Sequence, residues 1–416
     1  MQTNLAPEFR GTPDGEEADA ILRACVHCGF CTATCPTYQL LGDELDGPRG
    51  RIYLIKQVLE GGPVTAKTQL HLDRCLTCRS CETTCPSGVR YGRLADIGRK
   101  IVEDRVGRGA ADAAVRWSLR KGLTSRSLFG GALALGRIAR GLVPRELGRR
   151  IPASRPAGPW PAERHPRRMI ALEGCVQPSI APATDAALAR VLDRIGISLV
   201  RVGGAGCCAA VPYHLNDHDG AREMARRNID AWWPHLAAGA EAVVVTASGC
   251  GVMVKDYGHL LAHDPAYAER AAKVAALARD TVEVVGPEWK KIAPLVAMDL
   301  GPQRVAFHAP CSLQHGMKIR GEVEEILRAI GHELLPVADA HLCCGSAGTY
   351  SILQPEIAST LKRNKLAALE ADRPSVIATA NIGCQAHLAS GTARPVRHWI
   401  ELLDERMPGG MPAARR

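Results

Sequence analysis

The sequence has little of two things on which whole classes of protein depend, aromatic residues and long apolar runs. Phe, Trp and Tyr make up only 4% of the 416 residues. Because no recognition motif accompanies the basic charge either, nucleic acid is the least expected partner. No stretch is apolar over the roughly 20 residues that a membrane-spanning helix needs. The best candidate, residues 127–143, is interrupted by Arg137 and Arg140, so a membrane-spanning protein is not expected.

Two further signals are missing. The first twenty residues are polar and acidic and contain no apolar core, which argues against a secretory signal peptide. The chain also lacks a Gly-x-Gly-x-x-Gly run after a strand, so no dinucleotide site of its own is expected. We interpret the glycine-rich residues 203–206 as shaping a cysteine loop. Without export, thiols stay reduced, and the 16 cysteines are therefore expected to be metal ligands and not disulfides.

What the sequence does contain is one cysteine pattern that occurs twice. Cys-x2-Cys-x2-Cys-x3-Cys-Pro runs from Cys25 to Pro36 and again from Cys75 to Pro86. This spacing is typical of proteins that hold two 4Fe–4S clusters. A structural zinc site is the alternative, because Cys-x2-Cys pairs also bind zinc. Zinc sites normally pair two short hairpins, so two four-cysteine runs favour two 4Fe–4S clusters and one-electron transfer.

The spacing also predicts which thiolates share a cluster. Three cysteines separated by two residues each can wrap a short loop around one cluster, whereas the fourth lies too far along and ligates the other cluster. Proline after each fourth cysteine fixes φ and suits a sharp exit from the loop. The predicted ligand sets are Cys25, Cys28, Cys31 and Cys85 for one cluster, and Cys75, Cys78, Cys81 and Cys35 for the other.

The positive charge is concentrated in one segment. The chain has a formal net charge of +9, yet residues 99–168 contain seventeen Lys and Arg against five Asp and Glu. That segment therefore carries +12, and the rest of the chain is near −3. Such a basic segment can face an anionic membrane surface or an acidic partner subunit, and it can equally be a solvated connector.

The hydrophobic patterns divide the chain into four parts. Residues 1–105 are expected to form a mostly helical, two-cluster ferredoxin-like domain, and residues 106–167 a basic connector with a proline-rich end. Residues 168–300 and 301–416 alternate short apolar runs with helical patterns, which predicts parallel α/β structure and an α+β fold class overall. The expected strands are residues 169–172, 198–200, 242–245, 304–307, 333–335 and 376–378, and the clearest helices are 216–235 and 355–370.

A second cysteine duplication relates the last two parts. In each, one cysteine is followed by thirty-one residues, an adjacent pair, and later a fourth cysteine. The sets are Cys175, Cys207, Cys208 and Cys250, and Cys311, Cys343, Cys344 and Cys384. Because ligands of open α/β sheets lie beyond the carboxyl ends of the strands, four thiolates would meet there as a metal site in each repeat, with pseudo-twofold symmetry between the repeats. Eight buried structural cysteines are the alternative.

The second half resembles the CCG, or cysteine-rich, domain of heterodisulfide reductases, lactate-utilisation proteins and anaerobic glycerol-3-phosphate dehydrogenase subunits. The whole chain resembles the iron–sulfur subunits of bacterial glycolate oxidases, above all in residues 23–51, 227–233 and 341–350. The resemblance implies an electron-transfer subunit of an enzyme complex, with no flavin on this chain. Partner subunits with FAD would oxidise glycolate, or also D-lactate, and this chain would pass the electrons to a membrane quinone. It also implies one or two further iron–sulfur clusters in the CCG repeats, and a peripheral position on the cytoplasmic side of the inner membrane.

The sequence departs from the fullest CCG pattern in two ways. Heterodisulfide reductases have a fifth cysteine three residues after the fourth, where this chain has Met253 and His387. The first repeat also reads Cys-Cys-Ala, with Ala209 where the second repeat has Gly345. Both differences argue against a five-cysteine cluster, although four thiolates can hold an ordinary cubane and His387 is a further candidate ligand.

Two alternatives for the function stay open on the sequence alone. One is a heterodisulfide-reductase-like or lactate-utilisation subunit with its redox chemistry at the CCG clusters, and the other is a structural zinc protein. Three histidines near the cysteines are candidate proton relays to a quinone, although a single histidine is more often structural: His214, His308 and His315.

Overall fold

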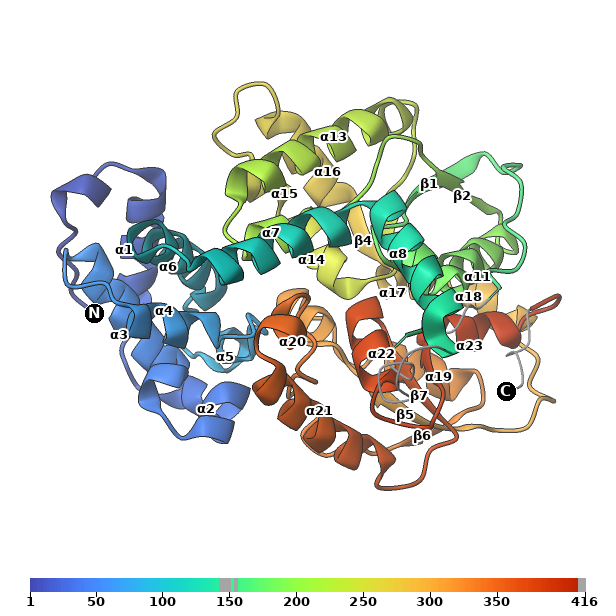
Figure 1. Cartoon of the computed structure of the whole chain (residues 1–416). Coiled ribbons are helices and arrows are strands. Elements are labelled where there is room, and N and C mark those ends of the chain that lie inside the picture. The colour runs from blue at the N-terminus through green and yellow to red at the C-terminus, as the bar shows by residue number, and fades with distance from the viewer. Residues whose placement is uncertain (142–150, 153–155, 411–416) are drawn as a thin grey trace.

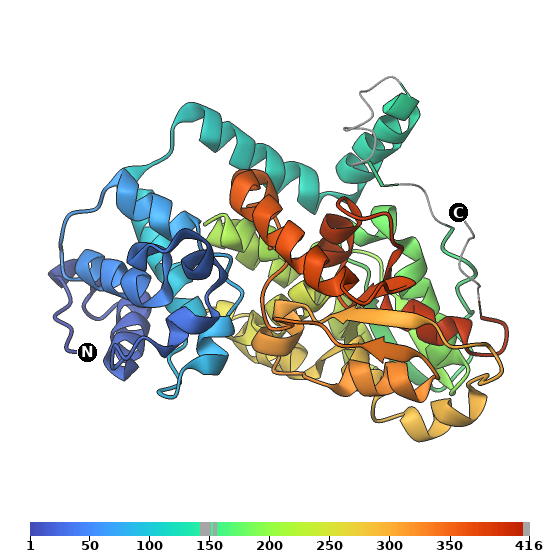
Figure 2. The same cartoon turned by 90° about the horizontal axis from the view of Figure 1, so that it is seen from below.

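The computed structural model describes residues 1–141, 151–152 and 156–410, and it places a helical region before two α/β lobes (Figures 1 and 2). The helical region, residues 7–106, lies at one end of the molecule in both views. It contains η1 (Pro7–Phe9), α1 (Pro13–Ala24), η2 (Phe30–Thr34), α2 (Pro36–Leu41), η3 (Glu44–Asp46), α3 (Pro48–Leu59), α4 (Ala66–Asp73), α5 (Ser80–Thr84) and α6 (Tyr91–Val106).

The helical region is held together by α3 and α6. Ile52, Ile55 and Leu59 lie on one face of α3, at the spacing that one helix face requires, and they pack against Leu94 and Val102 of α6. The short helices η2 and α5 lie side by side against this core, and both carry cysteines of the repeated pattern. The core therefore fixes the two cysteine loops relative to each other.

Two helices continue from the helical region along the outside of the molecule (Figures 1 and 2). They are α7 (Ala110–Thr124) and α8 (Arg126–Ile138), followed by one turn, η4 (Ala139–Gly141). Residues 142–150 and 153–155 of the expected basic connector lie outside the described residues. Within the described ranges, every helix is too short or too polar to cross a membrane.

The first lobe, residues 167–295, is built on a four-stranded parallel sheet with the strand order β2-β1-β3-β4. Its strands are β1 (Arg167–Leu172), β2 (Ile197–Arg201), β3 (Val243–Val245) and β4 (Ala278–Asp280). Its helices are α10 (Gln177–Ile180), α11 (Pro182–Asp193), α12 (Ala210–His214), α13 (His218–Ala237), α14 (Ser248–Lys255), α15 (Tyr257–Leu260), α16 (Ala268–Leu277), α17 (Thr281–Val285), α18 (Trp289–Ile292) and η5 (Ala293–Leu295). The register aligns Ile170 of the central strand with Val243 and Val200, and all three side chains are buried.

The second lobe, residues 304–405, repeats this plan in the order β6-β5-β7-β8, again all parallel. Its strands are β5 (Arg304–His308), β6 (Glu333–Leu335), β7 (Val376–Thr379) and β8 (Val396–His398). Its helices are the π-helical turn η6 (Ser312–Gly316), α19 (Glu322–Ala329), α20 (Tyr350–Leu353), α21 (Pro355–Glu370), α22 (Ile382–Ala389) and α23 (Trp399–Glu405). The structure thus confirms the predicted fold class, a helical region followed by a duplicated α/β unit.

The two lobes interlock reciprocally. The turn after the first cysteine of each lobe, α10 or η6, packs on the helix that carries the last cysteine of the other lobe, α22 or α14. Helix α11 of the first lobe also packs on α23 of the second, where the buried pair Arg190–Asp404 joins them at 2.6 Å. One hydrophobic core extends through both sheets and contains Val244 and Val305. Reciprocal contacts of this kind are what a pseudo-twofold relation between the lobes produces.

Candidate metal centres

The first cysteine loop surrounds a hollow in the helical region. The hollow measures about 430 Å³, part of it open to solvent, and its lining includes Cys25, Cys28, Cys31, Cys81 and Cys85. The chain can wrap around it because His27 and Gly29 have left-handed backbones, with φ of 60° and 85°. Burial, and next to it the charge of Cys25, raise the pKa of Cys31 to about 11, so without metal this thiol is protonated. Metal binding would release its proton.

The second cysteine loop surrounds a second hollow, of about 350 Å³. Its cysteines are Cys35, Cys75, Cys78 and Cys81, so Cys81 borders both hollows. The same two positions of the loop are left-handed again, Thr77 with φ of 52° and Arg79 with φ of 59°. The structure places Cys85 at the first hollow and Cys35 at the second. The assignment of individual thiolates as cluster ligands stays a prediction.

Two buried arginines distinguish Cys75 from its neighbours. Burial, the largest single effect, would raise its pKa, but the charges of Arg51 and Arg99 together with hydrogen bonding such as that from the Thr77 amide lower the pKa of Cys75 overall. Arg99 donates to the carbonyls of Leu72 and Cys75, which holds its charge beside the loop. Neither arginine was a predicted site residue, although Arg51 lies in the sequence run that follows the first cysteine pattern. A positive charge beside a thiolate or a reduced cluster stabilises it.

In the first lobe, the four cysteines lie beyond the carboxyl ends of β1, β2 and β3. The thiols are electrostatic neighbours in the order Cys175, Cys207, Cys208 and Cys250, because the pKa of each of the first three is influenced by the thiol that follows it. Ala209 adopts φ of 76°, close to the 89° of Gly345, so the alanine leaves the left-handed backbone of the loop unchanged. An alanine in this conformation costs about 1–2 kcal/mol.

A residue of α13 supports the adjacent cysteine pair of the first lobe. The Asn228 side chain accepts a hydrogen bond from the Gly206 amide and donates to the Cys207 carbonyl and to Tyr257 Oη, which itself donates to the Cys208 carbonyl. Asn228 and Tyr257 are both fully buried. Sequence reasoning missed this role, although Asn228 lies in the run 227–233 that carries the family resemblance. A polar residue on the buried face of a predicted helix was the available signal.

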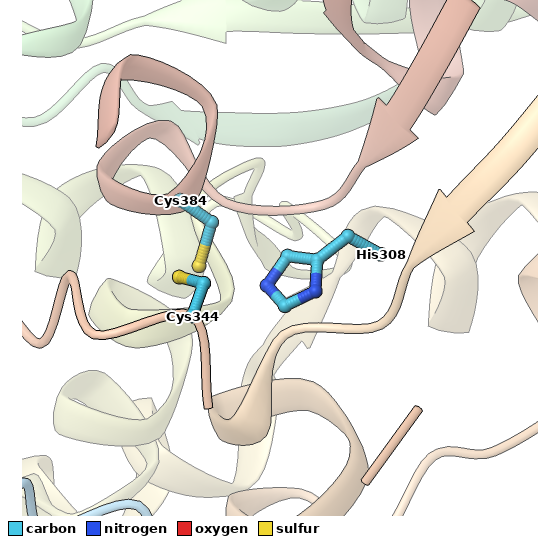
Figure 3. Close-up of side chains that lie close together, drawn as sticks. All are labelled: His308, Cys344 and Cys384. Atoms are coloured by element: carbon cyan, nitrogen blue, oxygen red, sulfur yellow. The ribbon is translucent and has the colours of Figure 1, made fainter. Parts of the chain in front are cut away.

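In the second lobe, the four cysteines again converge beyond the carboxyl ends of β5 and β7. The Sγ atoms of Cys311 and Cys343 lie 3.9 Å apart, and the pKa of Cys343 is influenced by Cys344 and that of Cys344 by Cys384, so the four thiols are neighbours. His308, the last residue of β5, joins them, because its nearest ring nitrogen and the sulfurs of Cys344 and Cys384 lie within 4.8 Å of one another (Figure 3). These donors fit a thiophilic metal such as iron or zinc.

The other predicted histidines are bound to protein groups. His387 Nε2 faces the Ala358 carbonyl at 3.4 Å. His315 contacts the Thr83 hydroxyl at 2.9 Å and the His341 carbonyl at 2.9 Å, and burial lowers its pKa to about 4. His214 lies 3.5 Å from Asp96. Burial also lowers the pKa of His308 to about 3, which keeps its ring neutral.

The helical region docks beside the second-lobe cysteines. Leu76, Cys343, Tyr350 and Ile357 form one small apolar cluster across this junction, and Cys78 and Cys311 border it. Tyr350 Oη donates to the Arg74 carbonyl at 2.9 Å, directly before Cys75. Burial, and next to it the charge of Cys311, raise the pKa of Cys78 well above its usual value. The second N-terminal cysteine loop and the second-lobe cysteines are therefore electrostatic neighbours.

Comparison with known proteins agrees with this arrangement. The family of 4Fe-4S dicluster domains matches residues 21–89, which contain all eight N-terminal cysteines, and the cysteine-rich domain family, CCG, matches residues 170–255 and 305–389. These matches confirm the predicted 4Fe–4S dicluster and the CCG duplication. In the second half they mark cysteine-rich candidate cluster sites.

Relatives match over the length of the chain. It is 55% identical over 409 residues to the glycolate oxidase iron-sulfur subunit of Escherichia coli strain K12, which covers 98% of this chain and 99% of the relative. It is 31% identical over 421 residues to the probable glycolate oxidase iron-sulfur subunit of Bacillus subtilis strain 168, covering 93% and 92%. Lactate utilization protein A of Geobacillus thermodenitrificans is 27% identical over 232 residues, covering 53% of this chain and 91% of that protein. The chain therefore belongs to the family of glycolate oxidase iron–sulfur subunits.

Proposed function

We propose that this chain is the electron-transfer subunit of a glycolate oxidase, taking electrons from FAD on partner subunits as glycolate becomes glyoxylate. The observation that carries the proposal is the junction of Cys78 with Cys311 and Cys343, because it joins the dicluster to the second lobe. The near full-length match to a glycolate oxidase iron-sulfur subunit supports the substrate. D-lactate is a second candidate substrate of the same complex.

The residues of the chain would hold and insulate the clusters, whose bound iron would carry single electrons. We propose that the sixteen cysteines are the ligands, eight in the dicluster and four in each lobe. The eight dicluster thiolates would divide as Cys25, Cys28, Cys31 and Cys85, and Cys75, Cys78, Cys81 and Cys35. Lobe residues such as Asn228 would hold the adjacent cysteine pair in place.

Electrons are proposed to arrive at the first cysteine loop. Cys28 is exposed there, and so are the apolar side chains of Val26 and Phe30 beside it. Exposed apolar residues at the rim of a redox site suit a partner subunit that covers them. From the first loop, electrons would pass to the second loop beside Cys81, which lines both hollows. They would then pass beside Cys78 to the second lobe.

The proposed acceptor is a membrane quinone, with the complex bound peripherally on the cytoplasmic side of the inner membrane. Helix α8 supports this placement, because none of its residues is buried and its apolar side chains Leu128, Leu135 and Ile138 are exposed. An amphipathic helix with basic residues and an exposed apolar face suits a membrane surface. Much of the basic charge nearby is used within the protein, in the pairs Arg108–Asp73, Arg116–Asp112, Arg120–Asp217, Arg126–Glu173, Arg164–Asp193 and Arg167–Glu241.

The division into four parts is proposed at residues 1–105, 106–167, 168–300 and 301–416. The element bounds support it, because α6 ends at Val106, β1 begins at Arg167 and β5 begins at Arg304. The first two boundaries lie within one residue of the end of α6 and the start of β1, and the third lies between η5 and β5, where a chain can pass from one packed unit to the next.

The test is an assay of the complex purified with its flavin subunits. We expect glycolate-dependent reduction of an artificial dye, together with iron and acid-labile sulfide on this chain. Activity with D-lactate and none with glycolate would make D-lactate the substrate of the complex. Thiol-dependent disulfide reduction without glycolate activity would favour the heterodisulfide-reductase-like alternative. A chain with zinc and no acid-labile sulfide would contradict the electron-transfer role.

A further inference from the structure

His308 is a buried histidine whose ring has no partner in the described protein. Only 2% of the residue is exposed, and neither Nδ1 nor Nε2 has a hydrogen-bond partner among the described residues. Leaving a buried polar atom unpaired costs about 1–3 kcal/mol, so such groups are rare and call for a physical cause. Coordination of a metal ion by the ring is one such cause.

The ring of His308 points at two sulfurs. It extends from the end of β5 toward the loop that carries Cys344 and the first turn of α22 that carries Cys384 (Figure 3). One ring nitrogen and these two sulfurs lie within 4.8 Å of one another. Ligand atoms of a tetrahedral site with metal–sulfur bonds of about 2.3 Å lie roughly 3.8 Å apart, so a small closure would bring all three onto one metal ion.

The first lobe lacks this histidine. Leu172 lies three residues before Cys175, as His308 lies three residues before Cys311. In the first sheet Leu172 is in register with Val245, whereas in the second sheet His308 is in register with Thr379. The hydroxyl of Thr379 is also buried and has no partner in the described structure. The histidine at the end of the first strand is therefore a property of the second lobe, and the first lobe has Leu172 at that place.

His387 is the competing candidate, because it occupies the position of a fifth cysteine in the sequence. Its Nε2 faces the Ala358 carbonyl, so that nitrogen is used by the protein. The group of close metal-binding atoms found in the described second lobe contains His308 and not His387. His387 lies on the same helix as Cys384, which makes it a matched control.

We propose that His308 is a ligand of the metal centre in the second lobe, where its ring would supply a fifth ligand beside the four cysteines. The site would bind a first-row transition metal through thiolates and one imidazole, either an iron of a cluster or a single zinc ion. The inference rests on the proposed metal binding of the second lobe, but it can fail by itself. A neutral imidazole in place of a thiolate also removes one negative charge, and in iron–sulfur centres histidine ligation raises the reduction potential.

The test uses the full-length chain labelled with ¹⁵N at its histidine rings and reconstituted anaerobically with iron and sulfide. Pulsed electron paramagnetic resonance then reports histidine nitrogens that are bonded to the reduced cluster. The variants are His308→Leu, which copies the first lobe, His308→Cys, which restores a thiolate, and His387→Leu as the control. The iron content of the N-terminal dicluster shows that each variant is folded.

We expect strong ¹⁵N coupling in the wild type and in His387→Leu, and its loss in both His308 variants, with metal content retained in His308→Cys. If the metal is zinc, His308→Leu should bind it at least about tenfold more weakly in a chelator competition, since losing even a supporting group of a metal ligand costs that much. Bound metal that is unchanged in His308→Leu, or coupling that is lost only in His387→Leu, would overturn the inference alone. A wild-type chain without metal beyond the dicluster would overturn the proposed metal binding of the second lobe as well.

Discussion

Cys75 shows how single charged residues prepare a cluster site. Its pKa is lowered despite burial, because Arg51 and Arg99 and the hydrogen bond from the Thr77 amide all favour the thiolate, while burial raises the pKa of Cys78 and Cys81 in the same loop. A cation that favours the thiolate favours the added electron of a reduced cluster for the same reason. The two arginines should therefore set the reduction potential of the second N-terminal cluster.

Replacing Arg99 by Gln should lower the reduction potential of that cluster by on the order of tens of mV, because a charge held near it in the protein interior is removed. The measurement is a redox titration followed by electron paramagnetic resonance. Arg105→Gln is the control, since Arg105 lies on the last turn of the same helix and pairs with Glu8. Equal shifts in the two variants, or a rise in Arg99→Gln, would contradict the electrostatic explanation.

Cys28→Ser and Cys78→Ser should each remove one N-terminal cluster and stop electron flow. Reduction of the flavin by glycolate should continue, because that chemistry is proposed on another chain. Rapid-mixing spectroscopy of the complex separates the two steps. The role assigned to these cysteines is wrong if flavin reduction also fails, or if electrons still reach the acceptor at the normal rate.

The loop after Cys344 can pack closely against α21 only because it contains Gly345. Gly345 has φ of 89°, and a Cβ atom there would lie 2.6 Å from the Ala358 carbonyl oxygen. Gly345→Ala should destabilise the second lobe by roughly 2–4 kcal/mol, from backbone strain and overpacking together. Gly348→Ala is the control, because Gly348 is left-handed too but has open space around it. An equal change of the unfolding temperature in both variants would show that the close approach of Gly345 to α21 does not contribute to stability.

Helix α8 is the element that we expect to touch the membrane. Leu135 is 69% exposed and Ile138 81%, and a Glu at both positions should release the complex from membranes. Raised salt should weaken the association only in part, since exposed charges are screened beyond about 8 Å but the apolar face is not. Met298→Glu, at an exposed apolar residue elsewhere, is the control. Unchanged sedimentation with membranes in the α8 variant would rule out this contact.

At the level of elements, the sequence predicts the strands that contain an apolar run and misses the two that do not. All six predicted runs coincide with β1, β2, β3, β5, β6 and β7, and the predicted helix 355–370 has the bounds of α21. The strands β4 and β8 were missed because neither has an apolar run: Ala278–Asp280 has one apolar residue in three, and so has Val396–His398. Such edge strands are specified by their neighbours in the sheet and not by an apolar run of their own.

Some features of the candidate sites could likewise be predicted from the sequence, and others could not. Cysteine spacing predicted which residues meet within each loop and each lobe, because the pattern is duplicated and ligands of α/β sheets lie beyond the carboxyl ends of the strands. The junction of Cys78 with the second lobe could not be predicted, since it depends on packing between residues such as Leu76 and Tyr350 that are far apart in sequence. The proximity of His308 to Cys384 likewise required the parallel pairing of β5 with β7.

At the scale of the whole molecule, one chain contains both the dicluster region and the two cysteine-rich lobes, and these parts are packed against each other. The helical region packs on both lobes, through Tyr350 on the second and through the Arg79–Asp256 ion pair on the first. Its second cysteine loop lies next to the second-lobe cysteines. The central claim is therefore that electrons enter at the dicluster and leave by way of the second lobe.

The most direct test of that claim mixes the intact complex with glycolate in the absence of oxygen and freezes samples at increasing times. Electron paramagnetic resonance then follows the reduced clusters, while absorbance follows the flavin and the acceptor. We predict that the dicluster signals appear after flavin reduction and before the acceptor is reduced. Full-rate reduction of the acceptor while the dicluster stays oxidised would contradict the account.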